Sequence, residues 1–289
     1  MIMPCPLCRS DRTRQYFSDN TITLLKCESC GLKFQHPMPT PVQLNEIYSL
    51  NYYDSFYPKK ILGEQKLLFL RRLEKLEALS GGKRGRVLDV GSGRGMFLEA
   101  ALERGWSCVG QEFSMDAAEA IQKRLGIEVV VCRELNKAGF EAESFDLVNM
   151  NHVLEHLYEP ELAVREIHRI LKPGGLFYCE VPRQGNFLNN LSNIFGKRDF
   201  GFSYLPEHLF LFDKRSLSML LNKSGFDVLS AKIEGLGDAH RFVRGVHYTS
   251  FWTRIIVMIV GGLRLQTPLG GGNLAVTSRK VMQDMEEPG

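Results

Sequence analysis

From residue 86 onward, the chain alternates between short apolar runs and stretches in which apolar residues recur every three or four positions. Short runs are typical of buried strands, and the longer spacing is typical of amphipathic helices. The runs predict strands at residues 87–90, 107–112, 127–132, 145–150, 176–181, 226–233 and 274–278. The helical spacing predicts helices at residues 96–104, 115–125, 160–171 and 214–224. This alternation indicates an α/β fold with a doubly wound sheet, which binds ligands at the carboxyl ends of its strands.

Residues that favour helix ends support these bounds. The hydroxyl of Ser114 can cap the helix at 115–125, and Gly126 can end that helix. Pro160 suits the first turn of the next helix, because its missing N–H is not needed there. The Lys172–Gly175 segment contains Pro and Gly and predicts a turn before the strand at 176–181.

A different pattern precedes the alternating region. Residues 1–62 contain four cysteines, three closely spaced prolines and an aromatic group that includes Tyr52 and Tyr53. Apolar residues at helical spacing then predict a helix over residues 64–79. We therefore divide the chain into a cysteine-bearing unit with an aromatic linker, residues 1–62, and an α/β domain, residues 63–289.

An insertion at residues 235–272 precedes the last predicted strand. It contains Phe251, Trp252 and the apolar run 255–260. Three roles stay open for it: a helix that covers the acceptor, a contact in a homodimer, or a face that lies on a membrane surface. The oligomeric state, monomer or homodimer, stays open with it. The longest apolar run here ends at Leu263, well short of the roughly 20 residues that span a bilayer.

Charge and composition narrow the classes of partner. The 289 residues include 36 Lys and Arg against 33 Asp and Glu, a formal net charge of +3. Because this excess is small and no dense basic block is present, we do not expect DNA as a partner. The amino terminus lacks the charged and apolar regions of a secretory signal. We expect a cytoplasmic protein whose cysteines stay reduced.

Two Cys-x-x-Cys pairs lie near the amino terminus. Cys5 and Cys8 are separated from Cys27 and Cys30 by 18 residues. This spacing is typical of a tetrahedral zinc site with four thiolate ligands. Because the protein fills all four positions, such a metal is structural rather than catalytic. We predict a small zinc knuckle that depends on the metal to fold, since it is too small to be stabilised by apolar burial alone.

A glycine-rich turn is the clearest candidate for cofactor binding. The strand that ends near Asp89 is followed by Gly91, Gly93 and Gly95. Glycine allows a positive φ and a close ligand approach, and the N–H groups of the following helix start face the turn. The spacing differs from the Gly-x-Gly-x-x-Gly of dinucleotide sites, which disfavours an NAD dehydrogenase. Glu112, about 20 residues further on, stands where a carboxylate binds ribose hydroxyls.

Three motifs in order resemble the class I S-adenosylmethionine-dependent methyltransferases. They are the glycine turn, the segment 144–156 with its Phe-Asp-Leu-Val and Val-Leu-Glu-His parts, and the Leu-Lys-Pro-Gly-Gly segment 171–175. The resemblance covers about residues 86–232. It implies a Rossmann-like sheet that is mostly parallel with an antiparallel last strand, and S-adenosylmethionine as the methyl donor.

The same resemblance implies roles for individual residues of the cofactor site. The floor of the site would be formed by Asp89, Gly91, Ser92, Gly93 and Gly95. Glu112 would bind the ribose, and Phe113 would lie beside the adenine. Glu134 and Leu135 would contact the adenine edge, although Cys132-Arg133-Glu134 departs from the commoner Gly-Asp. Asn151 and His152 would face the methionine part or the acceptor, and His156 would be either functional or a structural hydrogen-bond partner.

The cysteine-bearing unit resembles the zinc-binding region of a methyltransferase subgroup, several members of which methylate deoxysugars on nucleotide carriers. The segment 206–212 resembles the part of the sugar C-methyltransferases that supplies the base. Glu207 and His208 match that part, whereas Pro206 replaces its aromatic residue and Tyr204 lies two positions earlier. The resemblance implies His208 as general base and Glu207 as its orienting partner or as the base itself. Tyr204, with Tyr52 and Tyr53, would wall the acceptor pocket.

Methyl transfer is an in-line displacement that needs close alignment of nucleophile and methyl group, and a hydroxyl or C–H acceptor also needs a base. Histidine suits that role near neutral pH. We therefore expect transfer to a small-molecule acceptor, either a nucleotide-linked sugar or a related biosynthetic intermediate. Two alternatives stay open: an RNA methyltransferase whose zinc knuckle binds RNA, and a non-catalytic cofactor-binding protein. His208 could equally be a core histidine bonded to the backbone.

Overall fold

The computed structural model describes residues 3–18, 22–40, 42–43, 62–182, 207–235 and 272–281. The aromatic pair Tyr52 and Tyr53, Tyr204, and nearly all of the predicted insertion lie outside these residues. Within them the strands form one seven-stranded and one four-stranded sheet. None of the helices described there is long and apolar enough to cross a membrane.

The larger sheet has the strand order β10-β11-β8-β7-β4-β5-β6. Its strands are β4 (Arg86–Val90), β5 (Ser107–Glu112), β6 (Glu128–Val131), β7 (Phe145–Asn151), β8 (Leu171–Pro182), β10 (Phe226–Gly235) and β11 (Gly272–Lys280). The five strands from β8 to β6 run parallel to one another. The last strand, β11, is antiparallel to both of its neighbours. The mostly parallel sheet with an antiparallel last strand is thereby confirmed.

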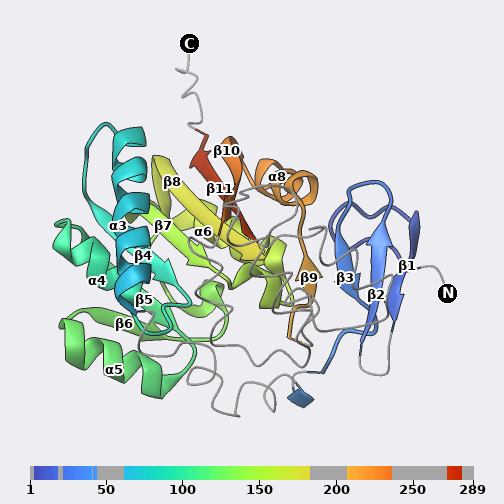
Figure 1. Cartoon of the computed structure of the whole chain (residues 1–289), viewed down its shortest axis with the longest axis horizontal. Coiled ribbons are helices and arrows are strands. Elements are labelled where there is room, and N and C mark those ends of the chain that lie inside the picture. The colour runs from blue at the N-terminus through green and yellow to red at the C-terminus, as the bar shows by residue number, and fades with distance from the viewer. Residues whose placement is uncertain are drawn as a thin grey trace, which may run out of the picture.

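Helices cover both faces of this sheet (Figure 1). One face carries α3 (Leu62–Leu79), α4 (Met96–Glu103) and α5 (Met115–Leu125), whose side chains share one apolar cluster. The opposite face carries α6 (Pro160–Ile170) and α8 (Lys214–Lys223), which share another cluster. Two short 3₁₀ turns, η2 (Leu135–Lys137) and η3 (Leu154–His156), follow β6 and β7. The doubly wound architecture follows, because each helix buries its apolar side against the sheet.

The predicted helix-boundary residues act as expected. Ser114 is the N-cap of α5, and its side chain accepts a hydrogen bond from the Ala117 N–H at 3.4 Å. Gly126 ends that helix in a left-handed conformation with φ of 65°. Pro160 occupies the first turn of α6, and Asp213 caps α8. Local sequence therefore determines these ends, because each cap satisfies backbone groups that the helix leaves unpaired.

One predicted boundary is wrong. The Lys172–Gly175 segment, expected as a turn outside the sheet, lies within β8. Phe145 pairs with Leu171 and Leu147 with Leu176, so the extra residues form an irregularity in the register against β7. Gly174, with φ of 75°, allows the chain to bulge there and then resume pairing.

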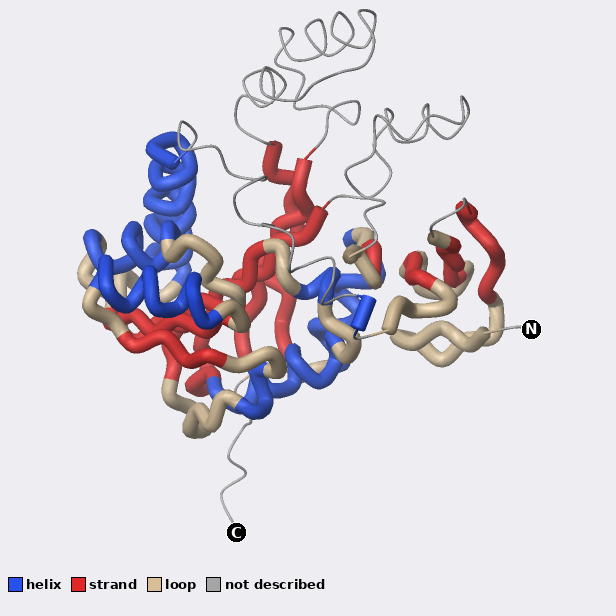
Figure 2. The backbone as a smooth tube through the Cα atoms, turned by 90° about the horizontal axis from the view of Figure 1, so that it is seen from below, coloured by secondary structure: helices blue, strands red, loops and turns tan. Residues whose placement is uncertain are grey.

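The smaller sheet contains a strand from the other end of the chain. Its order is β1 (Thr13–Ser18), β2 (Thr23–Cys27), β3 (Lys33–Gln35) and β9 (Phe210–Leu211). The sequence division had placed β9 in the α/β domain, yet it pairs antiparallel with β3. Figure 2 shows this sheet at one side of the larger domain, on the N-terminal side of the molecule. The two units share one apolar cluster, since Phe34 packs in it together with Phe210 and Leu217.

A buried carboxylate anchors α3 to the sheet domain. Glu77 accepts hydrogen bonds from Arg104 Nε at 2.7 Å, from Arg84 at 3.1 Å and from the Trp106 indole at 3.1 Å. Its side chain is 6% exposed. These donors, Arg104 first, lower the pKa of Glu77 to about 2 despite the opposing effect of burial. The anchor is therefore ionised throughout the neutral range.

The Glu77 anchor predicts a specific dependence of stability on pH. A carboxyl with a lowered folded-state pKa stabilises the fold above its unfolded value near 4.5, and this contribution is lost as the pH falls toward 2. We expect Glu77→Gln to lower the free energy of unfolding at pH 7 by up to about 3 kcal/mol and to flatten its change between pH 5 and 2. Urea unfolding at several pH values measures this, with the exposed Glu74→Gln as control. An unchanged pH dependence in Glu77→Gln would contradict the assignment.

Candidate functional site

The glycine turn joins β4 to α4. Gly91, Gly93 and Gly95 have φ values of 69°, 54° and 70°, a region that favours glycine. A Cβ added at Gly91 would lie 2.3 Å from the Cγ2 of Val153. Only glycine fits this position, because both the conformation and the neighbouring side chain exclude a larger residue. The turn is thus a bare backbone surface at the carboxyl end of β4.

Glu112 ties this turn to the end of β5. Its carboxylate accepts hydrogen bonds from the Gly93 N–H at 2.8 Å, the Phe113 N–H at 2.9 Å and the Ser114 N–H at 3.0 Å. The side chain is buried, with the residue 1% exposed. The structure therefore fixes a carboxylate directly beside the glycine turn, and it gives Glu112 a role in shaping the turn that the sequence did not predict.

Asp89 and its neighbours form the floor beneath the turn. Asp89 is buried, and its Oδ1 accepts a hydrogen bond from Asn149 Nδ2 at 2.6 Å. The Ser92 hydroxyl donates to the Asp89 carbonyl at 2.9 Å. Burial raises the pKa of Asp89 to about 7. Within the described residues, the buried Asn149 Oδ1 accepts no hydrogen bond. The floor therefore holds polar groups that water does not reach.

The residues predicted for the adenine lie at the ends of β5 and β6. Phe113 is 41% exposed, Met115 two residues later is also exposed, and so is Val131, which pairs with Glu112 at the end of β6. Leu135 is buried, whereas Glu134 is exposed and pairs with Lys137 at 2.9 Å. An exposed ring at the edge of the sheet can stack on a flat base. Phe113 is such an exposed ring, whereas the Glu134 side chain forms an ion pair with Lys137 at the surface.

A buried polar network follows the ends of β7, β8 and β11. Arg72 of α3 forms a buried ion pair with Glu180 and donates to Asn151 Oδ1 at 2.8 Å. The Tyr178 hydroxyl donates to Glu180 at 3.0 Å, and the guanidinium lies 4.1 Å from the Tyr178 ring centre. Although burial raises it, the pKa of Glu180 is held at about 2, chiefly by Arg72. The network orients Asn151 beside the glycine turn.

His152 links this network to a second group of side chains. Its Nε2 lies 3.0 Å from Asn273 Nδ2 and 3.6 Å from Glu180, while its Nδ1 lies 3.4 Å from Glu155. The backbone there has a φ of 53°, which side chains rarely adopt. Burial opposes protonation, but the two carboxylates raise the pKa of His152 to about 10. His152 is therefore an imidazolium that separates Glu155 from Glu180.

The second group consists of Glu155, His156 and His208. His156 and His208 are in edge contact, with ring centres 4.8 Å apart. His156 Nε2 lies 3.7 Å from Glu155 Oε1, and its Nδ1 lies 3.0 Å from the Glu207 carbonyl. Burial would raise the pKa of Glu155, but the interaction with His152 holds it below its usual value. Burial lowers the pKa of His156 to about 4, so this imidazole is neutral.

This group joins one buried carboxylate to two imidazole rings. One nitrogen or oxygen atom from each of Glu155, His156 and His208 lies within 4.8 Å of the others, a spacing that would also suit a divalent cation. Both oxygens of Glu155 are buried and, among the described residues, accept no hydrogen bond. The described contact of Glu207 with the group is through its carbonyl. Glu155, rather than the predicted Glu207, is thus the carboxylate that the structure places beside both histidines.

The four predicted zinc ligands come together in the smaller sheet. Cys5 and Cys30 have sulfur atoms 3.6 Å apart, and Cys8 and Cys27 have theirs 3.5 Å apart. All four sulfur atoms lie within 4.8 Å of one another. Tetrahedral zinc with bonds of about 2.3 Å requires sulfur atoms about 3.8 Å apart. The donor set and its spacing therefore fit zinc.

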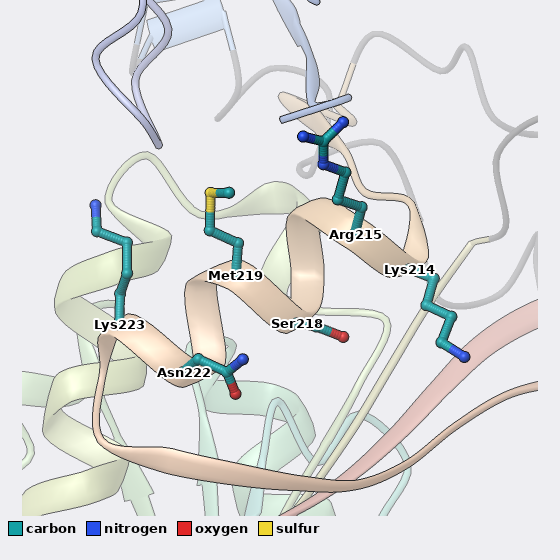
Figure 3. Close-up of a pocket in the computed structure, with 6 residues that line it drawn as sticks. All are labelled: Lys214, Arg215, Ser218, Met219, Asn222 and Lys223. Atoms are coloured by element: carbon teal, nitrogen blue, oxygen red, sulfur yellow. The ribbon is translucent and has the colours of Figure 1, made fainter. Parts of the chain in front are cut away.

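A surface hollow of about 620 Å³ lies elsewhere, along α8. It is lined by Lys214, Arg215, Ser218, Met219, Asn222 and Lys223. Arg215, Met219 and Lys223 extend from the same side of the helix (Figure 3), and Lys223 donates to the Leu7 carbonyl at 2.9 Å. None of the residues predicted for cofactor or catalysis lines it. The hollow is therefore not the predicted site.

Sequence reasoning missed Arg72, Glu155, Glu180 and Asn273 as members of the site. Two carried a signal: Glu180 interrupts an apolar strand, and Arg72 stands among the apolar positions of α3. A charged residue at a position that the pattern predicts to be buried is either paired or functional. Glu155 stood within a recognised motif, whereas nothing near Asn273 in the sequence marked it.

The chain is similar to known proteins over its α/β domain. A family model described as "Methyltransferase domain" matches residues 62–231, which is more than half of the chain. A ubiquinone biosynthesis O-methyltransferase from Coxiella burnetii is 32% identical over 142 residues, covering 47% of this chain and 59% of that protein. One of the same description from Hahella chejuensis is 34% identical over 131 residues, covering 43% and 53%. The chain thus spans less than two thirds of either relative.

Solved structures share the fold at lower identity. A 1,6-didemethyltoxoflavin-N1-methyltransferase from Burkholderia thailandensis, bound to S-adenosylhomocysteine, superimposes with a TM-score of 0.56 at 16% identity, covering 92% of this chain and 99% of that one. A SAM dependent methyltransferase from Archaeoglobus fulgidus gives a TM-score of 0.55 at 22% identity, covering 81% and 100%. These likenesses support the Rossmann-like arrangement of the sheet.

We expect the pKa values of the two histidines beside Glu155, His152 and His156, to be shifted in opposite directions from the ordinary value. His152, beside Glu155 and Glu180, should remain protonated up to about pH 9, and the buried His156 should remain neutral down to about pH 5. Imidazole nitrogen shifts from NMR measure both, with His152→Gln and His156→Gln identifying the signals. His168 of α6, which packs against the Phe226 ring, is the control. A neutral His152 at pH 7 would contradict the network.

Proposed function

The chain belongs to the methyltransferase domain family, and we propose that it transfers the methyl group of S-adenosylmethionine to a small-molecule acceptor. The observation that carries this proposal is the glycine turn together with Glu112 at the ends of β4 and β5, which we call the cradle. There the Glu112 carboxylate accepts a hydrogen bond from the Gly93 N–H, and Gly91 leaves no room for a side chain. Such a surface suits a nucleoside with a charged tail.

The residues of the cradle fit S-adenosylmethionine. Asp89, Gly91, Ser92, Gly93 and Gly95 would form the floor, with Glu112 at the ribose. Phe113 would stack on the adenine, with Leu135 and Glu134 at its edge, and Asn151 and His152 would face the methionine part. Bound there, the cofactor supplies a sulfonium methyl whose leaving group is already activated. The protein then has to bind it and align an acceptor.

His208 would act as the general base toward the acceptor. Its ring contacts the neutral His156 and lies near the buried Glu155 carboxylate. A neighbouring negative charge favours uptake of a proton by the His208 ring. A base of this kind removes the proton of a hydroxyl or an acidic C–H as the acceptor attacks the methyl group. The proton is then held by the imidazole, and the Glu155 charge stabilises it. Tyr204, for the acceptor wall, stays a prediction.

The acceptor class that we propose is a sugar, carried on a nucleotide, or a related biosynthetic intermediate. The segment Glu207–Phe212, which contains the proposed base, pairs with the cysteine-bearing sheet, and both resemble parts of sugar methyltransferases. The names of the curated relatives point to oxygen as the atom that accepts the methyl group. A hydroxyl acceptor agrees with a histidine base.

The cysteine-bearing sheet would hold one structural zinc ion. Support comes from the four sulfur atoms that converge within 4.8 Å. A tetrathiolate site has no open position, so the metal would not take part in methyl transfer. It would instead fix the loops that carry the two Cys-x-x-Cys pairs relative to β2 and β3.

Replacing Gly91 tests the cofactor cradle. Gly91→Ala places a methyl group against Val153 in a conformation that alanine disfavours, so the turn must shift. We expect the Kd for S-adenosylmethionine, measured by calorimetry, to rise at least tenfold. Gly105→Ala is the matched control, since Gly105 has φ of 83° but open space around it and lies away from the turn. No binding of S-adenosylmethionine by the wild-type chain would overturn the proposed function.

Replacing His208 tests the base separately from the cofactor site. We expect His208→Ala to lower the rate of methyl transfer at least 100-fold while the Kd for S-adenosylmethionine changes less than twofold. Incubation with labelled S-adenosylmethionine and a panel of nucleotide sugars and phenols, read by mass spectrometry, measures the rate. Glu207→Gln is the comparison, and it should retain more activity than Glu155→Gln, because a Glu155 carboxylate oxygen lies within 4.8 Å of both histidines. Full activity of His208→Ala would contradict the assignment.

A further inference from the structure

The proposed base stands on a segment that two distant parts of the chain hold in place. Residues 207–212 are buried between β3 of the smaller sheet and η3 of the larger domain. Lys33 pairs with Leu211 and Phe34 with Phe210, so β9 extends the cysteine-bearing sheet. The segment thus belongs by pairing to a unit nearly 180 residues away in sequence.

One side chain of that unit contacts the base residue directly. Gln35 Nε2 donates a hydrogen bond to the His208 carbonyl at 3.0 Å, and the Gln35 N–H donates to the Leu209 carbonyl at 3.0 Å. On the other side, the Leu209 N–H donates to the Glu155 carbonyl at 2.9 Å. Gln35 and His208 are 4% and 6% exposed. The backbone of residues 208 and 209 is therefore bonded on both sides, twice to Gln35 of β3 and once to η3.

These bonds matter because they are buried. A buried carbonyl that loses its donor is destabilising, so the segment would move to recover a partner. The position of the His208 ring determines its contacts with the other two residues of the group. Its ring centre lies 4.8 Å from that of His156, and a ring nitrogen lies within 4.8 Å of a Glu155 oxygen. A shift of about 1 Å in a reacting group can lower a rate about 100-fold.

We propose that Gln35 is a positioning residue through which the cysteine-bearing sheet holds His208 against His156 and Glu155. The inference rests on the proposed function, because it takes His208 as the base. It assigns the smaller sheet a role in the methyl-transfer site: the sheet sets the place of the base, whereas the glycine turn and the other ends of the larger sheet's strands set the place of the cofactor. Loss of the Gln35 contact should therefore lower the rate of methyl transfer without weakening the binding of S-adenosylmethionine.

The test replaces Gln35 by methionine in the full chain, which keeps the side chain's length and removes the donor. We expect kcat to fall at least tenfold, the Kd for S-adenosylmethionine to change less than twofold, and the zinc content to stay at one per chain. Hydrogen exchange of the 207–213 peptide should become at least tenfold faster, a change that peptides of β4 and β5 should not share.

The matched control is Gln122→Met. Gln122 Nε2 also donates to a backbone carbonyl, that of Val129, at 3.0 Å, but from α5. It should leave kcat and the exchange of the 207–213 peptide unchanged. An unchanged kcat and an unchanged exchange rate in Gln35→Met would overturn the positioning role while leaving the proposed function intact. Full activity of His208→Ala would instead overturn the base assignment and the inference with it.

A measurement on the wild-type chain covers the case in which Gln35→Met does not fold. Native-state hydrogen exchange at rising urea concentration groups peptides by the step in which they open. We expect the 207–213 peptide to open in the same step as residues 22–35 and before β7 and β8. Opening of that peptide together with β7 and β8, independently of residues 22–35, would overturn the inference.

Discussion

The parallel pairing of β5, β4, β7 and β8 is the constraint on which the rest of the structure depends. It brings the carboxyl ends of four strands to one edge, so the side chains that follow each strand must share a small space. The glycine turn, Glu112, Asn151 and His152 are neighbours for this reason. The cradle is therefore a property of strand order, and its chemistry is set by the residue that ends each strand.

This convergence buries several charged side chains. Around His152, each of them lies next to a side chain of opposite charge. Arg72 neutralises Glu180, and the imidazolium of His152 stands between Glu180 and Glu155. Removing one partner from such a chain would leave an uncompensated buried charge, which is strongly destabilising. The Glu155 carboxylate at the end of this row of alternating charges also lies beside the neutral His156 and beside His208. Stability and chemistry therefore rest on the same few groups.

The cysteine-bearing unit is joined to the α/β domain by pairing as well as by packing. β9 leaves the larger domain to complete the smaller sheet, and the apolar residues Phe34 and Phe210 belong to one shared cluster. The smaller sheet is therefore held against the larger domain on its β3 side. The division of the chain at residue 62 follows the sequence pattern. In the tertiary structure, β9 comes from the α/β domain but lies in the sheet of the cysteine-bearing unit.

The sequence by itself determined the strands and helices of the larger sheet, the glycine turn and the cysteine pairs, because spacing, caps and glycine preferences act over a few residues. It predicted none of the four strands of the smaller sheet. It predicted α5 to its ends and β11 as the antiparallel last strand through family resemblance. Only the tertiary structure decided that β9 joins the cysteine-bearing sheet, that Glu155 rather than Glu207 lies beside the histidines, and that Arg72 reaches Glu180. These are contacts between residues far apart in the chain, and local patterns carry no information on which distant groups will meet.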